Sequence, residues 1–294
     1  MREGAHGFST RRTPAPPDPA RAMLGGMPER VAVLSDIHGV LPALEAVLAE
    51  PDVRAADAVV LTGDLLAGPQ PAETLALLRG LGDRAVWVRG NADRELVELA
   101  RTDGTADGRE PLPVDAWAAG QLNAADVEFL AGLPANARLE VSGLGPVLFC
   151  HATPRDDTEV VLADSRPGRW AEVLAGVDAD VRTVVCGHTH MPFVRLVHGV
   201  LVVNPGSVGM PYGRPGAHWA LLGPDPGSGS RGGSGGGESV ALRRTPYDYD
   251  AACARIAAES GFAGAAEWAE EYVHARNSAE DALEAFGPLD GRDG

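Results

Sequence analysis

A chain of 294 residues, 45% of them hydrophobic, is long enough to bury a substantial core, which excludes a wholly disordered protein. Its formal net charge of −16 would repel a polyphosphate backbone, so binding of long nucleic acid is disfavoured. No apolar run is long enough to cross a membrane, and three cysteines without a Cys-x-x-Cys pair predict reduced thiols in a cytoplasmic protein.

The first 29 residues are rich in arginine, proline and glycine, and they lack the apolar stretch of a secretory signal. We expect residues 1–29 to form a disordered extension, with Met23 and Met27 as alternative translation starts. Residues 30–294 are then expected to form a single domain.

Six short apolar runs are typical of strands that are buried on both faces. They are VAVL at 31–34, AVVL at 58–61, AVWV at 85–88, VLFC at 147–150, TVVC at 183–186 and VLVV at 200–203. Helical patterns at 41–50, 71–82 and 114–134 separate several of them, and the first pattern has a proline in its first turn. Strands that alternate with helices predict the α/β fold class.

The glycine- and serine-rich stretch at 223–239 has the composition of an interdomain linker. However, HWALL at 218–222 precedes it and VALRR at 240–244 follows it, and both have strand patterns. We therefore predict a hairpin with a long flexible loop. The alanine-rich segment that begins at Tyr247 predicts a helical C-terminal tail.

Aspartate, asparagine or histidine follows each of the first five apolar runs. In open α/β sheets the carboxyl ends of the strands meet at one edge, so these side chains can converge. Oxygen and imidazole ligands without thiolates suit first-row divalent metals, and a set of this size suits two metals that share a carboxylate. The candidate ligands are Asp36, His38, Asp64, Asn91, His151, His188 and His190.

Each of these residues has an ordinary explanation when it is taken alone. A Gly-Asp pair after a strand is usually a turn or a helix cap, and a single histidine such as His151 is usually a structural hydrogen-bonding group. The occurrence of all of them at strand ends is improbable by chance, and it favours a metal centre.

The ordered motifs SDIHG, GDLLAGP, GNAD, CHATP, GHTHMP and NPGSVG resemble those of the calcineurin-like metallophosphoesterase superfamily. The chain is most similar to the small bacterial and archaeal phosphodiesterase branch, over a stretch from about Val31 to Leu222. The resemblance implies a four-layer α/β/β/α sandwich, in which two mixed β-sheets are flanked by helices, and a dinuclear metal site.

The resemblance also implies two divalent ions as cofactors, with manganese favoured and iron, zinc, nickel and cobalt as alternatives. One ion would be held by Asp36, His38, Asp64 and His190. The other would be held by Asp64, Asn91, His151 and His188. Asp64 would bridge the ions, and a hydroxide between them would attack the phosphorus.

Asp64 and Asn91 are therefore the expected catalytic residues. Asn91 is also an expected substrate contact, together with Arg214 in the loop after NPGSVG, for which an ordinary surface position is the alternative.

Ala92 departs from the commonest family motif, which is Gly-Asn-His followed by an acidic residue. That histidine is thought to stabilise the transition state or to protonate the leaving oxygen. Its absence should least affect esters with good leaving groups. Asp93 could replace the histidine as an acid, or it could orient a neighbouring ligand.

The function implied is a metal-dependent phosphoesterase that hydrolyses small phosphodiesters. A phosphomonoesterase and a non-catalytic protein-binding scaffold of the same fold are the alternatives. A protein serine/threonine phosphatase fits worse, because Gly63 and Asp64 are followed by LLAGP and not by the x-x-Asp-Arg-Gly of that group. We expect a small phosphoester as partner, no long nucleic acid, no membrane and, by default, a homodimer.

Overall fold

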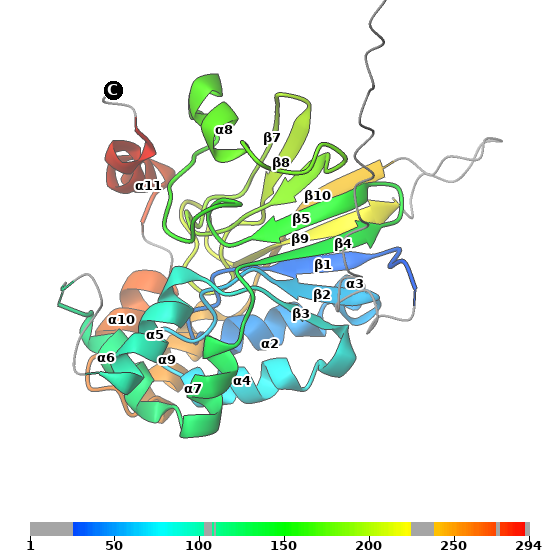
Figure 1. Ribbon diagram of the computed structural model, residues 1–294. Coiled ribbons are helices and arrows are strands. Elements are labelled where there is room, and N and C mark those ends of the chain that lie inside the picture. Colours follow the sequence, from blue (N-terminus) through cyan, green and yellow to red (C-terminus); the bar gives the residue numbers. More distant parts are fainter. Residues whose placement is uncertain (1–25, 103–107, 109, 225–237, 275–276, 292–294) are drawn as a thin grey trace, which may run out of the picture.

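The computed structural model of the protein describes residues 26–102, 108, 110–224, 238–274 and 277–291 (Figure 1). The expected disordered extension therefore lies outside the described residues as far as residue 25, and so does the centre of the expected flexible loop, 225–237. No helix within the described ranges is both long enough and apolar enough to cross a membrane.

Two mixed five-stranded sheets form the centre of the molecule, which confirms the predicted architecture. In the first sheet, with the order β10-β9-β1-β2-β3, the last three strands are parallel and β9 is antiparallel to both of its neighbours. Its strands are β1 (Val31–Leu34), β2 (Ala58–Leu61), β3 (Ala85–Trp87), β9 (Ala217–Pro224) and β10 (Glu238–Thr245).

The second sheet has the order β4-β5-β6-β8-β7, with a parallel centre and an antiparallel strand at each edge. Its strands are β4 (Asn136–Val141), β5 (Gly145–Cys150), β6 (Thr183–Val185), β7 (Phe193–Val197) and β8 (Val200–Asn204). All six predicted apolar runs are strands, whereas β4 and β7 were not predicted.

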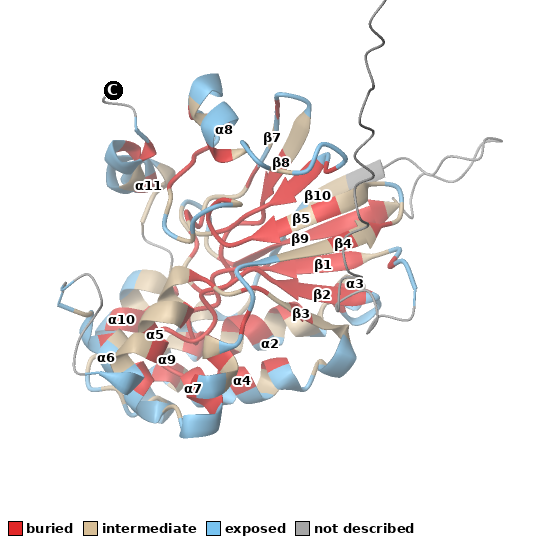
Figure 2. Ribbon diagram, viewed as in Figure 1, coloured by how far each residue is buried: buried red, intermediate tan, exposed pale blue. Residues whose placement is uncertain are grey.

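Alternate residues of each central strand face different apolar layers, because successive side chains of a strand point to opposite faces. Val31 and Val33 of β1 pack between the sheets with Phe149 of β5. Leu34 of β1 instead packs under the helices. Both faces of the central strands are therefore buried, as the red ribbons of Figure 2 show, and this explains their unbroken apolar sequences.

Helices cover the outer face of each sheet and complete the four layers (Figure 1). The first sheet is covered by α2 (Leu41–Ala49), α3 (Pro51–Arg54), α4 (Pro71–Arg79), α5 (Asn91–Arg101), α6 (Pro113–Gln121), α7 (Ala124–Ala131), α9 (Tyr249–Glu259) and α10 (Ala265–Tyr272). The second is covered by α8 (Pro167–Val173), whose Trp170 is buried against Phe193. A further helix, α11 (Ala279–Phe286), and the short 3-10 turns Gly82–Arg84 and Gly287–Asp290 complete the elements.

The prediction of a single helix over 114–134 is wrong, because the helix is interrupted between α6 and α7. The side-chain oxygen of Asn123 accepts hydrogen bonds from the backbone N–H groups of Ala125 and Asp126, at 2.9 and 3.1 Å. Asparagine is a strong N-cap because it satisfies the free N–H groups of a first turn. It therefore starts a new helix where the apolar spacing alone suggested continuity.

The segments on either side of the expected loop form paired strands, and the segment after Tyr247 begins with a helix. Strands β9 and β10 pair antiparallel from Pro224 with Glu238 to Ala217 with Thr245. The sequence after Tyr247 forms α9, which packs on α10.

Candidate metal centre

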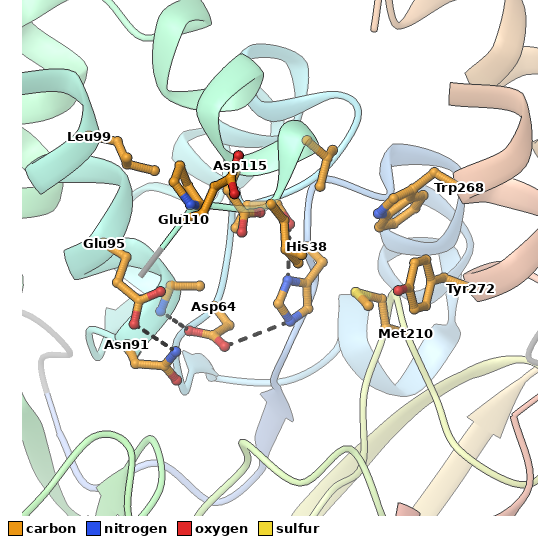
Figure 3. A pocket seen from close by; sticks show the side chains of 15 residues that line it. His38, Asp64, Asn91, Glu95, Leu99, Glu110, Asp115, Met210, Trp268 and Tyr272 are labelled. Carbon is orange, nitrogen blue, oxygen red and sulfur yellow. Dashed lines mark hydrogen bonds and ion pairs between the residues drawn. The ribbon is translucent and has the colours of Figure 1, made fainter. Parts of the chain in front are cut away.

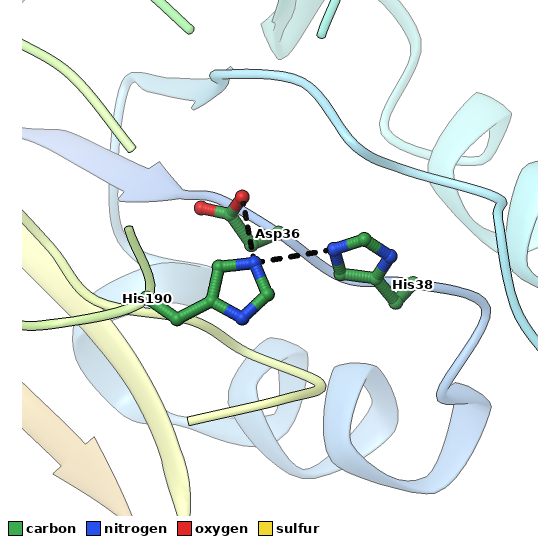
Figure 4. Close-up of side chains that lie close together, drawn as sticks. All are labelled: Asp36, His38 and His190. Atoms are coloured by element: carbon green, nitrogen blue, oxygen red, sulfur yellow. Dashed lines mark hydrogen bonds and ion pairs between the residues drawn. The ribbon is translucent and has the colours of Figure 1, made fainter. Parts of the chain in front are cut away.

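The candidate ligands leave the carboxyl ends of β1, β2, β3, β5 and β6 and meet where the two sheets come together. Asp36, His38 and His190 form one group, shown in Figure 4. Asp64, His151 and His188 form a second group. Within each group the possible ligand atoms lie within 4.8 Å of one another.

Asn91 joins the second group. Its Oδ1 lies 3.0 Å from Nε2 of His151 and 3.1 Å from Nδ1 of His188. The fold thus brings all the predicted ligands into one cluster, although they span 155 positions of sequence from Asp36 to His190.

Most of these residues have a strained backbone. A positive φ is uncommon outside glycine, because the Cβ atom approaches the backbone, and it costs roughly 1–2 kcal/mol per residue. The ligands with a positive φ are Asp36 (55°), His38 (49°), Asp64 (53°), His188 (68°) and His190 (55°). Among the described non-glycine residues only His198 shares this conformation. Such clusters of strain occur at functional sites, where the surrounding structure holds them in place.

Backbone hydrogen bonds between the loops hold this strained arrangement. The N–H groups of Asp36 and His38 donate to the carbonyls of Gly63 and Asp64, each at 3.0 Å. The hydroxyl of Ser207 donates to the carbonyl of Asp36 at 2.7 Å. The loops after β1, β2 and β8 are therefore joined to one another and do not move independently.

Each of the four histidines has one ring nitrogen against a backbone carbonyl, which fixes the direction of the other nitrogen. Nδ1 of His38, His151 and His190 lies 3.0, 2.8 and 2.7 Å from the carbonyls of Ala67, Thr62 and Met210. His188 uses Nε2, which lies 3.1 Å from the carbonyl of Thr158. The remaining nitrogens face the cluster, and each can offer a lone pair to a metal ion when its ring is neutral. Sequence patterns could not reveal these partners, because a carbonyl is present at every residue.

The lone pairs face one another at distances that fit a cation between them. Nε2 of His38 and Nε2 of His190 are 3.3 Å apart. Two nitrogens at about 2.0–2.1 Å from a tetrahedral ion would be about 3.3 Å apart. The amide oxygen of Asn91 likewise faces two ring nitrogens, and the reversed amide would donate to the same nitrogens in the absence of an ion. A cation at this position would select the orientation in which the amide oxygen faces the two ring nitrogens.

Asp64 lies between the two groups. Its Oδ2 is 3.3 Å from Nε2 of His151 and 3.7 Å from Nε2 of His38. Its Oδ1 accepts a hydrogen bond from the N–H of Ala92 at 2.8 Å. One carboxylate oxygen is thus oriented by the backbone while the other faces both groups, as a shared ligand must.

Charges of both signs are concentrated in this buried cluster. Burial opposes ionisation of Asp36 and Asp64, but His190 and His151 respectively hold the pKa of each carboxyl below its usual range. Burial opposes protonation of His151, yet Asp64 and Asp36 raise its pKa to about 10. Burial lowers the pKa of His188 to about 4. Two buried carboxylates therefore stay ionised, and positive charge must accompany them.

Asp93 has the orienting role that was one of its two expected alternatives. It is buried, and its Oδ2 accepts hydrogen bonds from the N–H groups of Asp64 and Gly90, both at 2.9 Å. Its Oδ1 accepts from the N–H of Leu65 at 2.9 Å. Burial and the charge of Asp64 raise the pKa of Asp93 to about 7, against these N–H groups. Its carboxyl joins the end of β2 to the start of α5.

Arg214 is not brought into the cluster. It is exposed, and its carbonyl oxygen lies 2.9 Å from Nε2 of His218. Its contact with substrate therefore stays a prediction without support from the geometry. Cys150 and Cys186 are buried free thiols in the layer under α8.

A cavity of about 340 Å³ opens beside His38, Asp64 and Asn91 (Figure 3). Its other lining residues include Glu95, Glu110, Asp115, Trp268 and Tyr272, none of which was predicted. Only Glu95 carried a sequence signal, because it lies one helical turn after Asn91 in α5. The remainder come from segments whose position depends on tertiary packing.

A pair of polar clusters at the meeting edges of two mixed sheets, with helices on both outer faces, is the architecture of a metallophosphoesterase. Residues 30–225 match the model of the calcineurin-like phosphoesterase superfamily domain. The chain therefore belongs to the calcineurin-like phosphoesterase superfamily, a family of phosphoester hydrolases that use divalent metals.

The chain is similar to several known proteins. An uncharacterized protein of Methanocaldococcus jannaschii, MJ0912, is 28% identical over 201 residues, which are 62% of this chain and 76% of that protein. The crystal structure of a metallophosphoesterase from Sphaerobacter thermophilus is 27% identical, with a TM-score of 0.60, over 84% of this chain and 99% of that one. Hypothetical protein PH1004 from Pyrococcus horikoshii shares the fold, with a TM-score of 0.66 at 19% identity, over 85% of this chain and 99% of that one.

Proposed function

We propose that this protein is a phosphodiesterase that hydrolyses small phosphodiesters with two divalent metal ions, for which manganese is the favoured identity. The observation that carries this proposal is the position of Asp64 Oδ2 between two groups of converging lone pairs. A single ion would leave one of the groups without a cation. Loss of ligands would favour a non-catalytic scaffold, but every predicted ligand is present and directed into the cluster.

Each metal ion would have its own set of ligands, with one carboxylate shared. Asp36, His38 and His190 would hold one ion, Asn91, His151 and His188 the other, and Asp64 both. Bound divalent ions supply Lewis-acid charge to the phosphoryl oxygens and lower the pKa of a water. Because Asn91 is neutral, the ligands contribute only the two carboxylate charges. The loaded site would keep a net positive charge that attracts an anionic phosphodiester.

The first test is activity of the metal-stripped protein on bis-p-nitrophenyl phosphate and on p-nitrophenyl phosphate. We expect no turnover without metal, recovery with Mn²⁺, and faster turnover of the diester than of the monoester. Faster turnover of the monoester would identify a phosphomonoesterase. Tight binding of manganese, iron, zinc, nickel and cobalt without any turnover would identify a scaffold.

The side chain at position 92 is a methyl group and cannot act as a general acid. Ala92 lines the cavity beside Asp64, and only its backbone N–H contacts the cluster. A histidine there could protonate a leaving oxygen, and general acid catalysis contributes roughly 10²–10⁴-fold. We expect Ala92→His to raise the rate on an alkyl diester by about 10²-fold and to change the rate on an aryl diester little, because an aryl oxide leaves without a proton. The measurement is kcat for both esters.

Ala92→Asn is the matched control, because it adds similar bulk without an acid of suitable pKa. The acid hypothesis would be rejected if histidine changed both esters equally, or if asparagine reproduced its effect.

A further inference from the structure

The cavity beside the metal centre has two chemically different walls (Figure 3). Carboxylates occupy one wall: Glu95 projects from α5, Glu110 precedes α6, and Asp115 lies in the first turn of α6. Trp268 and Tyr272 of α10 occupy the opposite wall together with Met210. The two rings form a corner, with centroids 5.0 Å apart and planes tilted by 48°.

No lining residue that the structure describes in this cavity is an arginine, although the chain has 25 basic residues. The arginines near the centre line a different cavity, of about 280 Å³, beside His151. They are Arg89, Arg94 and Arg155. Helix α5 separates the two cavities, because Ala92 and Glu95 face the first and Arg94 faces the second. Of the lining carboxylates, Arg94 reaches Oε1 of Glu95, at 3.8 Å, so Glu110 and Asp115 give the wall away from the metal centre its negative charge.

We propose that this cavity receives an ammonium group carried by one ester arm of the substrate, so that the substrate class is a phosphodiester with a cationic alcohol. The inference rests on the proposed function, because it places the phosphodiester group at the metal centre. Carboxylates repel a second phosphate or a carboxylate on that arm and attract a cation. Trp and Tyr faces attract ammonium groups through their quadrupoles, most strongly when the cation is desolvated.

Ala92 makes room for that arm. It lines the cavity together with Asn91 and Asp115, so a larger side chain there would take up part of the cavity. A small residue at position 92 therefore leaves more of the cavity free for the ester arm.

The preference for a cation should grow with pH. Burial, with the charges of Glu95 and Asp64, raises the pKa of Asp115 to about 7. Other ionisable groups that line the cavity are His38, Glu110 and Tyr272, and burial raises the pKa of Tyr272 to about 12. Asp115 thus ionises at a higher pH than an ordinary aspartate, so the cation should bind more tightly at pH 8 than at pH 6.

The test compares two esters of equal shape: p-nitrophenyl phosphorylcholine and its uncharged isostere, p-nitrophenyl 3,3-dimethylbutyl phosphate. We expect kcat/KM to be about tenfold higher for the choline ester at pH 8, through a lower KM. Asp115→Asn and Glu110→Gln should each reduce this ratio severalfold, and Asp115→Asn should remove its rise between pH 6 and pH 8. Glu284→Gln, exposed on α11, is the control and should leave the ratio unchanged.

Equal kcat/KM for the two esters, a preference for the uncharged one, or an unchanged ratio in both cavity variants would overturn the proposal. Failure of the phosphodiesterase function is a separate outcome, namely no turnover of either ester or of bis-p-nitrophenyl phosphate. In that case, saturable quenching of tryptophan fluorescence by tetramethylammonium, weakened in Asp115→Asn, would still support the cation site. Equal quenching in both proteins would reject it.

Discussion

The Asp64→Asn variant should lose at least about 10³-fold in kcat on bis-p-nitrophenyl phosphate and should bind one manganese ion where the parent protein binds two. The reason is the position of its carboxylate. Oδ2 lies 3.3 and 3.7 Å from imidazole nitrogens of the two groups, so it faces both. An amide keeps the shape but has no charge to offset the repulsion between two cations. Steady-state kinetics and titration calorimetry measure the two losses.

Glu110→Gln is a matched control for the loss of one carboxylate near the centre, because Glu110 lines the cavity without belonging to either ligand group. It should bind two ions. Far-UV circular dichroism verifies that Asp64→Asn is folded. A folded Asp64→Asn protein with two ions bound and full activity would show that Asp64 is not shared.

The Gly90→Ala variant should lose both stability and metal affinity. A Cβ atom at Gly90 would lie 2.1 Å from Oδ1 and 2.4 Å from the backbone nitrogen of Asp64. Neither atom can withdraw, because Asp93 and Ala92 hold the same segment by hydrogen bonds. Overpacking of this kind costs roughly 1–3 kcal/mol, and displacement of Asp64 should weaken metal binding more than tenfold. Urea unfolding of the metal-free protein and calorimetry measure these effects.

Gly120→Ala is the control for Gly90→Ala. Gly120 is an exposed residue of α6, and an added Cβ atom there meets nothing within 4 Å. Alanine should stabilise the helix by about 0.5–1 kcal/mol and leave metal binding unchanged. If Gly90→Ala were as stable as the parent and bound metal equally well, the segment around Asp64 would be able to shift despite its hydrogen bonds, and the overpacking argument would be wrong.

Much of the fold was predictable because the central strands are buried on both faces. That burial requires uninterrupted apolar residues, as in Val31–Leu34 and Ala58–Leu61, and such runs are visible without a structure. Edge strands such as β4 and β7 face solvent in part, so their mixed sequences did not predict them. The false single helix over 114–134 arose because apolar spacing continues across Asn123, while the cap that divides it depends on one side chain.

The sequence by itself determined the chemical identity of the candidate ligands and their order along the chain. It could do so because each follows a buried strand, and parallel strands place their carboxyl ends together. Only the tertiary structure decided how the site works in detail. The carbonyls that orient the histidines, the placement of Asp64 between the groups and the carboxylate wall opposite Trp268 all join segments that are far apart in sequence. A backbone carbonyl has no sequence signature, and a cavity wall exists only after α5, α6 and α10 have packed around the sheet edge.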